Sequence, residues 1–273
     1  MIKIVTVIKT SGEKDKFDSS KLMNSLMRAG TEQSIAEKIL IKIKPRLYDG
    51  ISTMKIYRMA FKELRKSDNP SASRYEVKWA IARLGRNGEG FSFEEFVEKI
   101  FERMGYAVKR DHIIKGKSGI THEIDVIAEK GKEKILIECK HHTQPGMWIN
   151  VHTPLYVYAR YLDLKDKFTG AMIITNSRFS EQSEVYANSV GLKLMGWSYP
   201  AGKSLQEIVD RYAIYPITVL HSIDNASVGR LLVKDIVTVA DILTTPNSRL
   251  FSIIGGRADA VKREAESVVL KQN

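Results

Sequence analysis

The sequence predicts a multidomain α and α/β protein with three parts, at residues 1–87, 88–218 and 219–273. In the first part, helical apolar spacing follows a short alternating strand. In the second, two strongly apolar strands follow an amphipathic helix, and in the third only short helical stretches occur. With 273 residues, 43% of them hydrophobic, the chain is long enough to form several compact cores.

Composition excludes several classes of protein. The single cysteine, Cys139, rules out an internal disulfide framework and a four-cysteine zinc site. No apolar run approaches the ~18 residues of a membrane helix, and the N-terminal residues lack the apolar core of a signal peptide. We therefore expect a soluble, cytoplasmic protein with no membrane partner.

The positive charge is concentrated in one third of the chain. The net charge is +11, of which residues 1–87 carry +10, residues 88–218 carry zero and residues 219–273 carry +1. A basic surface can serve solubility alone. Because nearly all the excess lies in one segment, however, the charge favours an anionic, phosphate-bearing partner.

The first part is predicted to be a β-hairpin followed by a helical bundle. Residues 3–9 alternate polar and apolar, residues 10–13 favour a turn, and residues 14–17 can form the returning strand. Four helices should follow: from a cap at Asp18 or Ser19 to Arg28, through 35–43 up to Pro45, from a cap at Thr53, and over 72–84.

This order of elements resembles the ATP-cone, a nucleotide-sensing domain, over residues 3–84. The matching stretches are Val7–Gly12, Phe17–Leu22, Thr53 with Ile56, and Ala72–Tyr75. Lys9-Thr10 stands where the family usually has Lys-Arg. The resemblance implies that ATP or dATP binds here, with Lys9 and Lys21 on the phosphates, Gly12 in the hairpin turn and Thr53 near the nucleotide. Ammonium groups on a hairpin and a helix start can converge on a triphosphate. The alternative is that these lysines are only solvated surface.

The second part begins with a glycine-rich hinge at 85–90 and an amphipathic helix from Phe93 to Met104. Short strands at 106–108 and 113–114 follow, and then a turn at 115–119. Residues 122–128 and 134–140 are predicted to be strands joined by a hairpin loop at 129–133.

Charged residues interrupt these two apolar strands. Leu136, Glu138 and Lys140 share one strand face by alternation, and Asp125 interrupts the preceding strand in the same way. Burying such charges is costly unless they have partners or a task. If the strands pair, Asp125, Glu138 and Lys140 cluster. The two carboxylates can then hold Mg²⁺ or Mn²⁺, while the lysine stabilises charge on a phosphate.

This Asp125…Glu138-x-Lys140 pattern resembles the active site of PD-(D/E)XK nucleases, and its surroundings resemble their Mrr-like restriction endonuclease branch. Supporting stretches are 93–106, 122–128, 137–140 and 173–180. The resemblance implies a mixed sheet flanked by helices, with Glu94 as a further acidic member of the site. Glu94 can equally be an ordinary solvated charge. Arg160 and Arg178 could contact phosphate, although no motif marks them.

The third part resembles a degenerate helix-hairpin-helix module. Residues 231–243 are predicted to form two helices, the second capped by Thr238, and residues 250–261 lead through Gly255-Gly256 into a final helix. A glycine-containing hairpin can offer backbone amides to DNA phosphates. With a net charge of only +1, packing or dimerisation remains equally open.

Together these features predict a metal-dependent DNA endonuclease regulated by ATP or dATP, acting as a homodimer. No P-loop motif occurs in the sequence, so we do not expect ATP-driven translocation by this chain. The alternative is a catalytically inactive, nucleotide-responsive DNA-binding regulator. A basic structural scaffold would explain the charge but not the carboxylates on apolar strands. DNA or RNA as substrate, and single-stranded or branched forms, stay open.

Overall fold

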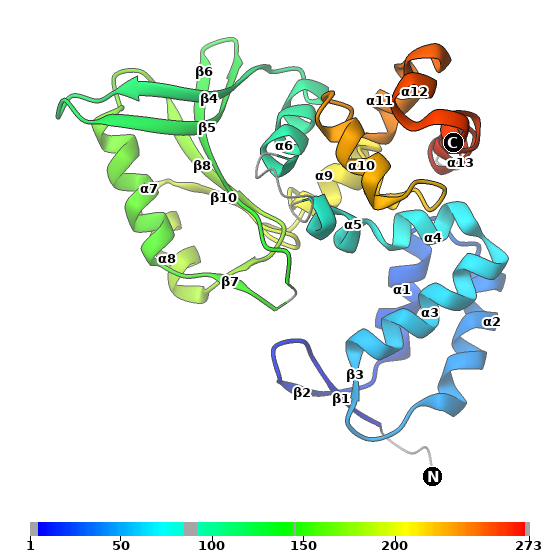
Figure 1. The fold of residues 1–273 in the computed structure, drawn as a ribbon. Coiled ribbons are helices and arrows are strands. Elements are labelled where there is room, and N and C mark those ends of the chain that lie inside the picture. The colour runs from blue at the N-terminus through cyan, green and yellow to red at the C-terminus, as the bar shows by residue number, and fades with distance from the viewer. Residues whose placement is uncertain (1–4, 85–91, 145, 271–273) are drawn as a thin grey trace.

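The computed structural model describes residues 5–84, 92–144 and 146–270. The predicted hinge at 85–90 lies outside these ranges. Figure 1 shows the β-hairpin and helices α1–α4 at one end of the molecule, the large sheet with α7 and α8 at the other, and helices α10–α13 beside α6.

The N-terminal domain is the predicted hairpin and helical bundle. Its small sheet has the order β2-β1-β3, with β1–β2 antiparallel and β1–β3 parallel. Val7 of β1 packs with Leu22, Leu26 and other apolar residues of the helices in one core. The elements are β1 (Thr6–Ile8), β2 (Lys14–Lys16), α1 (Ser19–Arg28), α2 (Gln33–Ile43), β3 (Ile51–Ser52), α3 (Thr53–Ser67), α4 (Asn69–Tyr75) and α5 (Val77–Leu84).

Two details of this domain differ from the prediction. Ser52, not Thr53, caps α3, because the Ser52 side chain accepts a hydrogen bond from the backbone N–H of Lys55 at 3.2 Å. The predicted helix over 72–84 is broken at Glu76 into α4 and α5. Asp68 caps α4 and Pro70 lies in its first turn, so that this helix begins three residues before the predicted start at Ala72.

The central domain is the expected mixed sheet flanked by helices. Its strand order is β10-β8-β6-β5-β4, with β4, β5 and β6 antiparallel and β6, β8 and β10 parallel. The strands of the sheet are β4 (Ala107–Lys115), β5 (Thr121–Lys130), β6 (Glu133–Lys140), β8 (Gly170–Thr175) and β10 (Lys193–Met195). The helices are α6 (Ser92–Arg103), α7 (His152–Asp163), α8 (Glu181–Val190) and α9 (Leu205–Tyr212). A separate, small parallel pair consists of β7 (Trp148–Ile149) and β9 (Arg178–Phe179).

The two faces of this sheet pack into different cores. Ile135, Ile137 and Cys139 join the core that contains α6, whereas Leu136 joins the core that contains residues of α7 and α8. Alternation along β6 is therefore as predicted, and Glu138 lies on the α7 side. The two predicted short strands at 106–108 and 113–114 are one strand, β4, with Asp111 at a positive φ of 53° in its middle.

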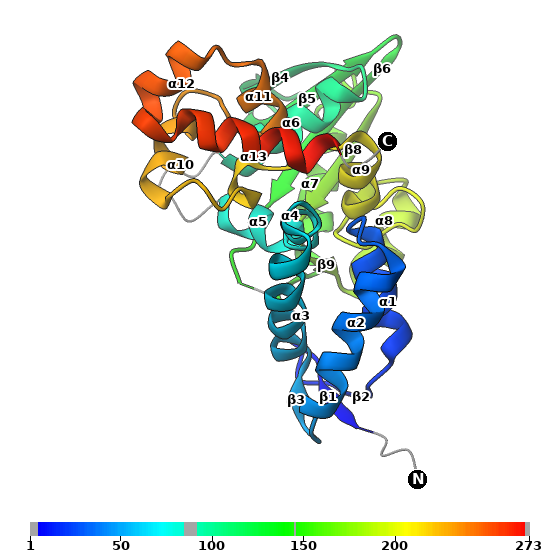
Figure 2. The ribbon, with the colours of Figure 1, turned by 90° about the vertical axis from the view of Figure 1, so that its right-hand side faces the viewer.

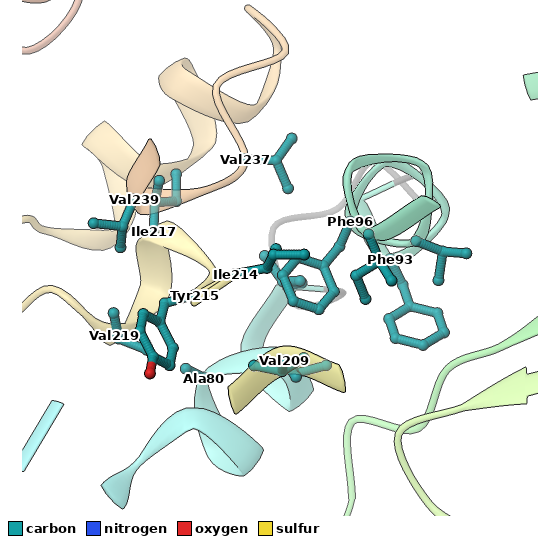
Figure 3. Close-up of a cluster of buried hydrophobic side chains, with 14 of the residues drawn as sticks. Ala80, Phe93, Phe96, Val209, Ile214, Tyr215, Ile217, Val219, Val237 and Val239 are labelled. Carbon is teal, nitrogen blue, oxygen red and sulfur yellow. The ribbon is translucent and has the colours of Figure 1, made fainter. Parts of the chain in front are cut away.

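The C-terminal helices share a core with both other domains. They are α10 (Asn225–Leu232), α11 (Val239–Thr244), α12 (Asn247–Ile254) and α13 (Ala258–Leu270). As predicted, Thr238 caps α11. Figure 3 shows Ala80 of α5, Phe96 of α6 and Val237 within one buried cluster. In Figure 2, α13 runs across the front of this region, near α4.

A buried arginine also connects the first and last domains. Arg74 of α4 is 7% exposed and donates from Nε to the carbonyl of Ala29 at 2.7 Å and from Nη1 to that of Val268 at 2.9 Å. Its contacts join the end of α1 to α13.

Candidate active site

Pairing of β5 with β6 brings Asp125 and Glu138 together. Val126 lies opposite Ile137, so the next residues outward, Asp125 and Glu138, come side by side at the end of the ladder. The backbone N–H of Cys139 donates to Oδ2 of Asp125 at 2.7 Å. Two carboxylates from neighbouring strands therefore meet at one point of the sheet.

Glu138 is buried between two cations. Its side chain is 4% exposed, Nζ of Lys140 lies 2.6 Å from Oε1, and Nη1 of Arg160 donates to Oε2. Arg160 comes from α7 and also donates to the carbonyl of Glu123 at 3.0 Å. Its guanidinium lies 4.6 Å from the centre of the Tyr156 ring. These contacts compensate the buried charge and fix the direction of the carboxylate.

Asp125 and Glu94 hold protons more tightly than ordinary carboxyl groups. Burial raises the pKa of Asp125 to about 6, and the charge of Glu138 adds to the rise. Burial raises the pKa of Glu94, in the first turn of α6, to about 7, with contributions from Asp125 and Asp111. Oε2 of Glu94 is buried and has no hydrogen-bond partner among the described residues. Glu94 therefore lies close enough to Asp125 for the charge of one carboxylate to disfavour ionisation of the other.

Sequence reasoning missed Asp111. Arg110 pairs with Val126 and His112 with Ile124, so that Asp111 lies opposite Asp125 but outside the regular ladder. Aspartate tolerates positive φ better than most residues, yet nothing local in the sequence marks this position. It adds a third carboxylate to the neighbourhood of Glu94 and Asp125.

The donor set fits a hard divalent cation with few protein ligands. Within the described ranges, no group of three or more His, Cys, Asp or Glu residues forms a metal cage. Mg²⁺ is commonly bound by one or two carboxylates plus water and phosphate oxygens. Asp125 and Glu138 supply such a pair. Their mutual repulsion, and the unpartnered oxygen of Glu94 nearby, are conditions that a bound cation would relieve.

The predicted nucleotide residues fall into two groups. Lys9 and Thr53 both line a cavity of about 290 Å³, whereas Gly12 and Lys21 do not line it. Nζ of Lys9 and Nζ of Lys21 each lie 3.3 Å from the same carboxylate oxygen of Asp15. The hairpin and the start of α1 therefore bring the two ammonium groups to one carboxylate, and their binding to nucleotide phosphates stays a prediction.

Comparison with protein families gives three matches along the chain. The ATP cone domain matches residues 5–84, and the restriction endonuclease domain Mrr_cat matches residues 86–198. The AF1548-like C-terminal domain matches residues 215–269. The chain belongs to the Mrr-type restriction endonuclease family. Membership of the PD-(D/E)XK superfamily follows from the Mrr-type match, and the predicted resemblances to the ATP-cone and to Mrr-like endonucleases are confirmed, whereas no comparison tests the helix-hairpin-helix resemblance.

An archaeal relative matches nearly two thirds of the chain. An uncharacterized protein of Archaeoglobus fulgidus is 34% identical over 174 residues, which are 63% of this chain and 98% of the relative. The crystal structure of the protein of unknown function AF1548 is also 34% identical, with a TM-score of 0.59, and covers 65% of this chain and 97% of its own.

Within the Mrr-type domain, Asp125 lies in the middle of β5, and Glu138 and Lys140 lie at the end of β6. In the ATP-cone, Lys9 lies just after β1 and Thr53 begins α3. No helix in the described part of the chain is long and apolar enough to cross a membrane.

Proposed function

We propose that this protein is a metal-dependent DNA endonuclease, which hydrolyses phosphodiester bonds and is regulated by ATP or dATP. The observation that carries the proposal is the meeting of Asp125 and Glu138 on paired strands, with the ammonium of Lys140 2.6 Å from Glu138. An Mrr-type domain and an ATP-cone in one chain support a nuclease with nucleotide regulation.

Asp125 and Glu138 would hold Mg²⁺ or Mn²⁺. Such an ion supplies activation of water and stabilisation of developing negative charge. Lys140, whose side chain is 40% exposed, is accessible to the phosphate and can stabilise its charge. Glu94, with a pKa of about 7, can accept a proton from water on its unpartnered Oε2 near neutral pH.

One observation favours a second candidate, an inactive nucleotide-responsive DNA-binding regulator. Both oxygens of Glu138 already have cationic partners, Lys140 and Arg160. If Arg160 kept its place when DNA binds, Glu138 would be poorly available to a metal ion. The nuclease proposal requires that a divalent cation compete with Lys140 and Arg160 for the carboxylate of Glu138.

Three finer predictions belong to this proposal. Cutting both strands of a duplex calls for a homodimer, and the protein is expected in the cytoplasm. The C-terminal domain can contact DNA through Gly255-Gly256, between α12 and α13. Its first hairpin, in contrast, carries Asp235 at a positive φ of 57°, which pairs with Arg110 of the central domain at 3.1 Å. That contact supports a packing role for this hairpin.

Cleavage assays test the proposal. The protein would be incubated with supercoiled plasmid and with branched DNA, in Mg²⁺ or Mn²⁺, with and without ATP or dATP. A variant carrying both Asp125→Ala and Lys140→Ala serves as the comparison. We expect metal-dependent nicking that the double variant lacks. Salt-sensitive DNA binding without cleavage of any substrate would support the regulator instead.

A further inference from the structure

The cavity of about 290 Å³ lies between the ATP-cone and the nuclease domain. One wall comes from the ATP-cone, with Lys9, Thr53 and Lys78, and the other from the nuclease domain, with His142 and Arg178. Its volume is near the lower end of the range for small-molecule sites, about 300–1,000 Å³. In Figure 1 the β1–β2 hairpin lies below β7.

The charges around this cavity favour binding of an anion. Burial lowers the pKa of the Lys78 ammonium, and the positive charge of Arg178 lowers it further. Among the described residues, neither side chain forms an ion pair with a carboxylate. Instead, Lys78 lies 5.8 Å from the centre of the Trp197 ring, and Arg178 lies 4.4 Å from that of Trp148. Two cations that repel each other across a cavity would both be stabilised by a polyphosphate.

The cavity wall is continuous with the catalytic strand. β6 ends at Lys140, and the second residue after it, His142, lines the cavity. The backbone N–H of His142 donates to Asn176 at 2.8 Å, while His141 is hydrogen-bonded to the carbonyl of Ile81 in α5 at 2.9 Å. The segment after Lys140 is thus attached to the ATP-cone on one side and to the strand end of β8 on the other.

The hairpin itself touches the same loop. Gly146 has a φ of +86°, and a Cβ atom added there would lie 3.1 Å from the backbone oxygen of Thr10 in the hairpin turn. Glycine is needed at this position because its backbone approaches the hairpin closely. Movement of the hairpin on a ligand would therefore reach the loop that follows Lys140.

We propose that the regulatory nucleotide binds in this interdomain cavity as a composite site, in which Arg178 of the nuclease domain joins Lys9 and Lys78 on the phosphates. Binding then fixes the loop after Lys140 against the hairpin and alters the cleavage rate. This inference rests on the proposed nucleotide regulation. It adds the side chains that bind the phosphates and the route by which nucleotide binding reaches the proposed active site.

Titration calorimetry of the full chain with ATP and with dATP tests the composite site independently of cleavage. We expect Arg178→Ala and Lys78→Ala each to raise the Kd at least about tenfold, the usual loss for a charged contact. The matched control is Arg103→Ala, an exposed arginine of the same nuclease domain, which should bind as the wild type does. Adenosine without phosphates is expected not to compete.

Several outcomes would overturn the inference. If Arg178→Ala bound ATP as tightly as the wild type while Lys9→Ala did not, the site would lie within the ATP-cone alone. If adenosine competed with ATP, the phosphates would not be needed for binding, and the cationic side chains would not form the site. A wild type that binds no nucleotide would contradict both this site and the proposed regulation. Absence of cleavage with intact, Arg178-dependent ATP binding would instead contradict only the nuclease proposal.

Two glycine variants test whether the hairpin and the loop after Lys140 are coupled. Gly146→Ala adds a methyl group against Thr10, whereas Gly119→Ala introduces similar backbone strain, at a φ of +89°, where nothing lies within 4 Å. We expect Gly146→Ala to reduce the ratio of cleavage rates with and without ATP at least threefold, and Gly119→Ala to leave this ratio unchanged. Equal ratios in both variants would overturn the proposed route.

Discussion

The guanidinium of Arg160 in α7 donates a hydrogen bond to the buried carboxylate of Glu138 in β6. The pair links the strand of the proposed active site to the helix that covers it. Because Lys140 engages the other carboxylate oxygen, Glu138 is oriented before any ligand binds. The residue that orients Glu138 is therefore as much a part of the site as the motif itself.

Replacing this arginine should destabilise the fold. Arg160→Met removes one partner of a buried ion pair, so the free energy of unfolding should fall by about 3 kcal/mol. Urea denaturation followed by circular dichroism measures the change, with the exposed Arg103→Met as a control expected to stay within about 0.5 kcal/mol. A loss below about 1 kcal/mol for Arg160→Met would show that the pair contributes little.

The stability of the metal-free protein should depend on Glu94. The folded-state pKa of about 7 lies above the ordinary value of 4.5, so the folded protein binds the proton more tightly than the unfolded chain does. The resulting stability is fully present below about pH 4.5 and is lost as pH rises through 7. Between pH 5 and 8 the wild type should lose up to about 3 kcal/mol relative to Glu94→Gln. Denaturation in EDTA across this range measures it. Parallel curves for the two proteins would contradict the assigned pKa.

Arg74 should stabilise the junction between the first and last domains. Arg74→Met removes the hydrogen bonds to the carbonyls of Ala29 and Val268 and leaves both without that donor, so we expect a loss of about 3 kcal/mol. The exposed Arg46→Met is the control. Limited proteolysis should also cut Arg74→Met faster at α13. Unchanged stability and unchanged proteolysis would show that the C-terminal helices are held by apolar contacts alone.

The residues of the motif could be predicted because their signal is local. Asp125, Glu138 and Lys140 interrupt apolar strands, and alternation is enough to place Glu138 and Lys140 on one face. The cap of α1 could be predicted as Asp18 or Ser19, and the cap of α11 as Thr238, for the same reason, since a capping side chain acts within its own turn.

The rest depends on contacts between distant parts of the chain. Arg160 lies on a different element from its partner Glu138, and its helix gives no sign of that pairing. Asp111 adopts a positive φ that no sequence motif predicts. The break at Glu76 separates α4, which carries Arg74, from α5, which packs in the core shared with α6. Tertiary packing decides each of these features.

The most direct test of the central claim is the nicking rate of supercoiled plasmid in Mg²⁺ by Asp125→Asn. The account predicts a rate at least about 10²-fold below the wild type, a loss typical of removing one strong electrostatic contribution to a reaction. Glu129→Gln, on the same strand but paired with Lys134 at the surface, should cleave at the wild-type rate. An Asp125→Asn protein that nicks as fast as the wild type would contradict the account.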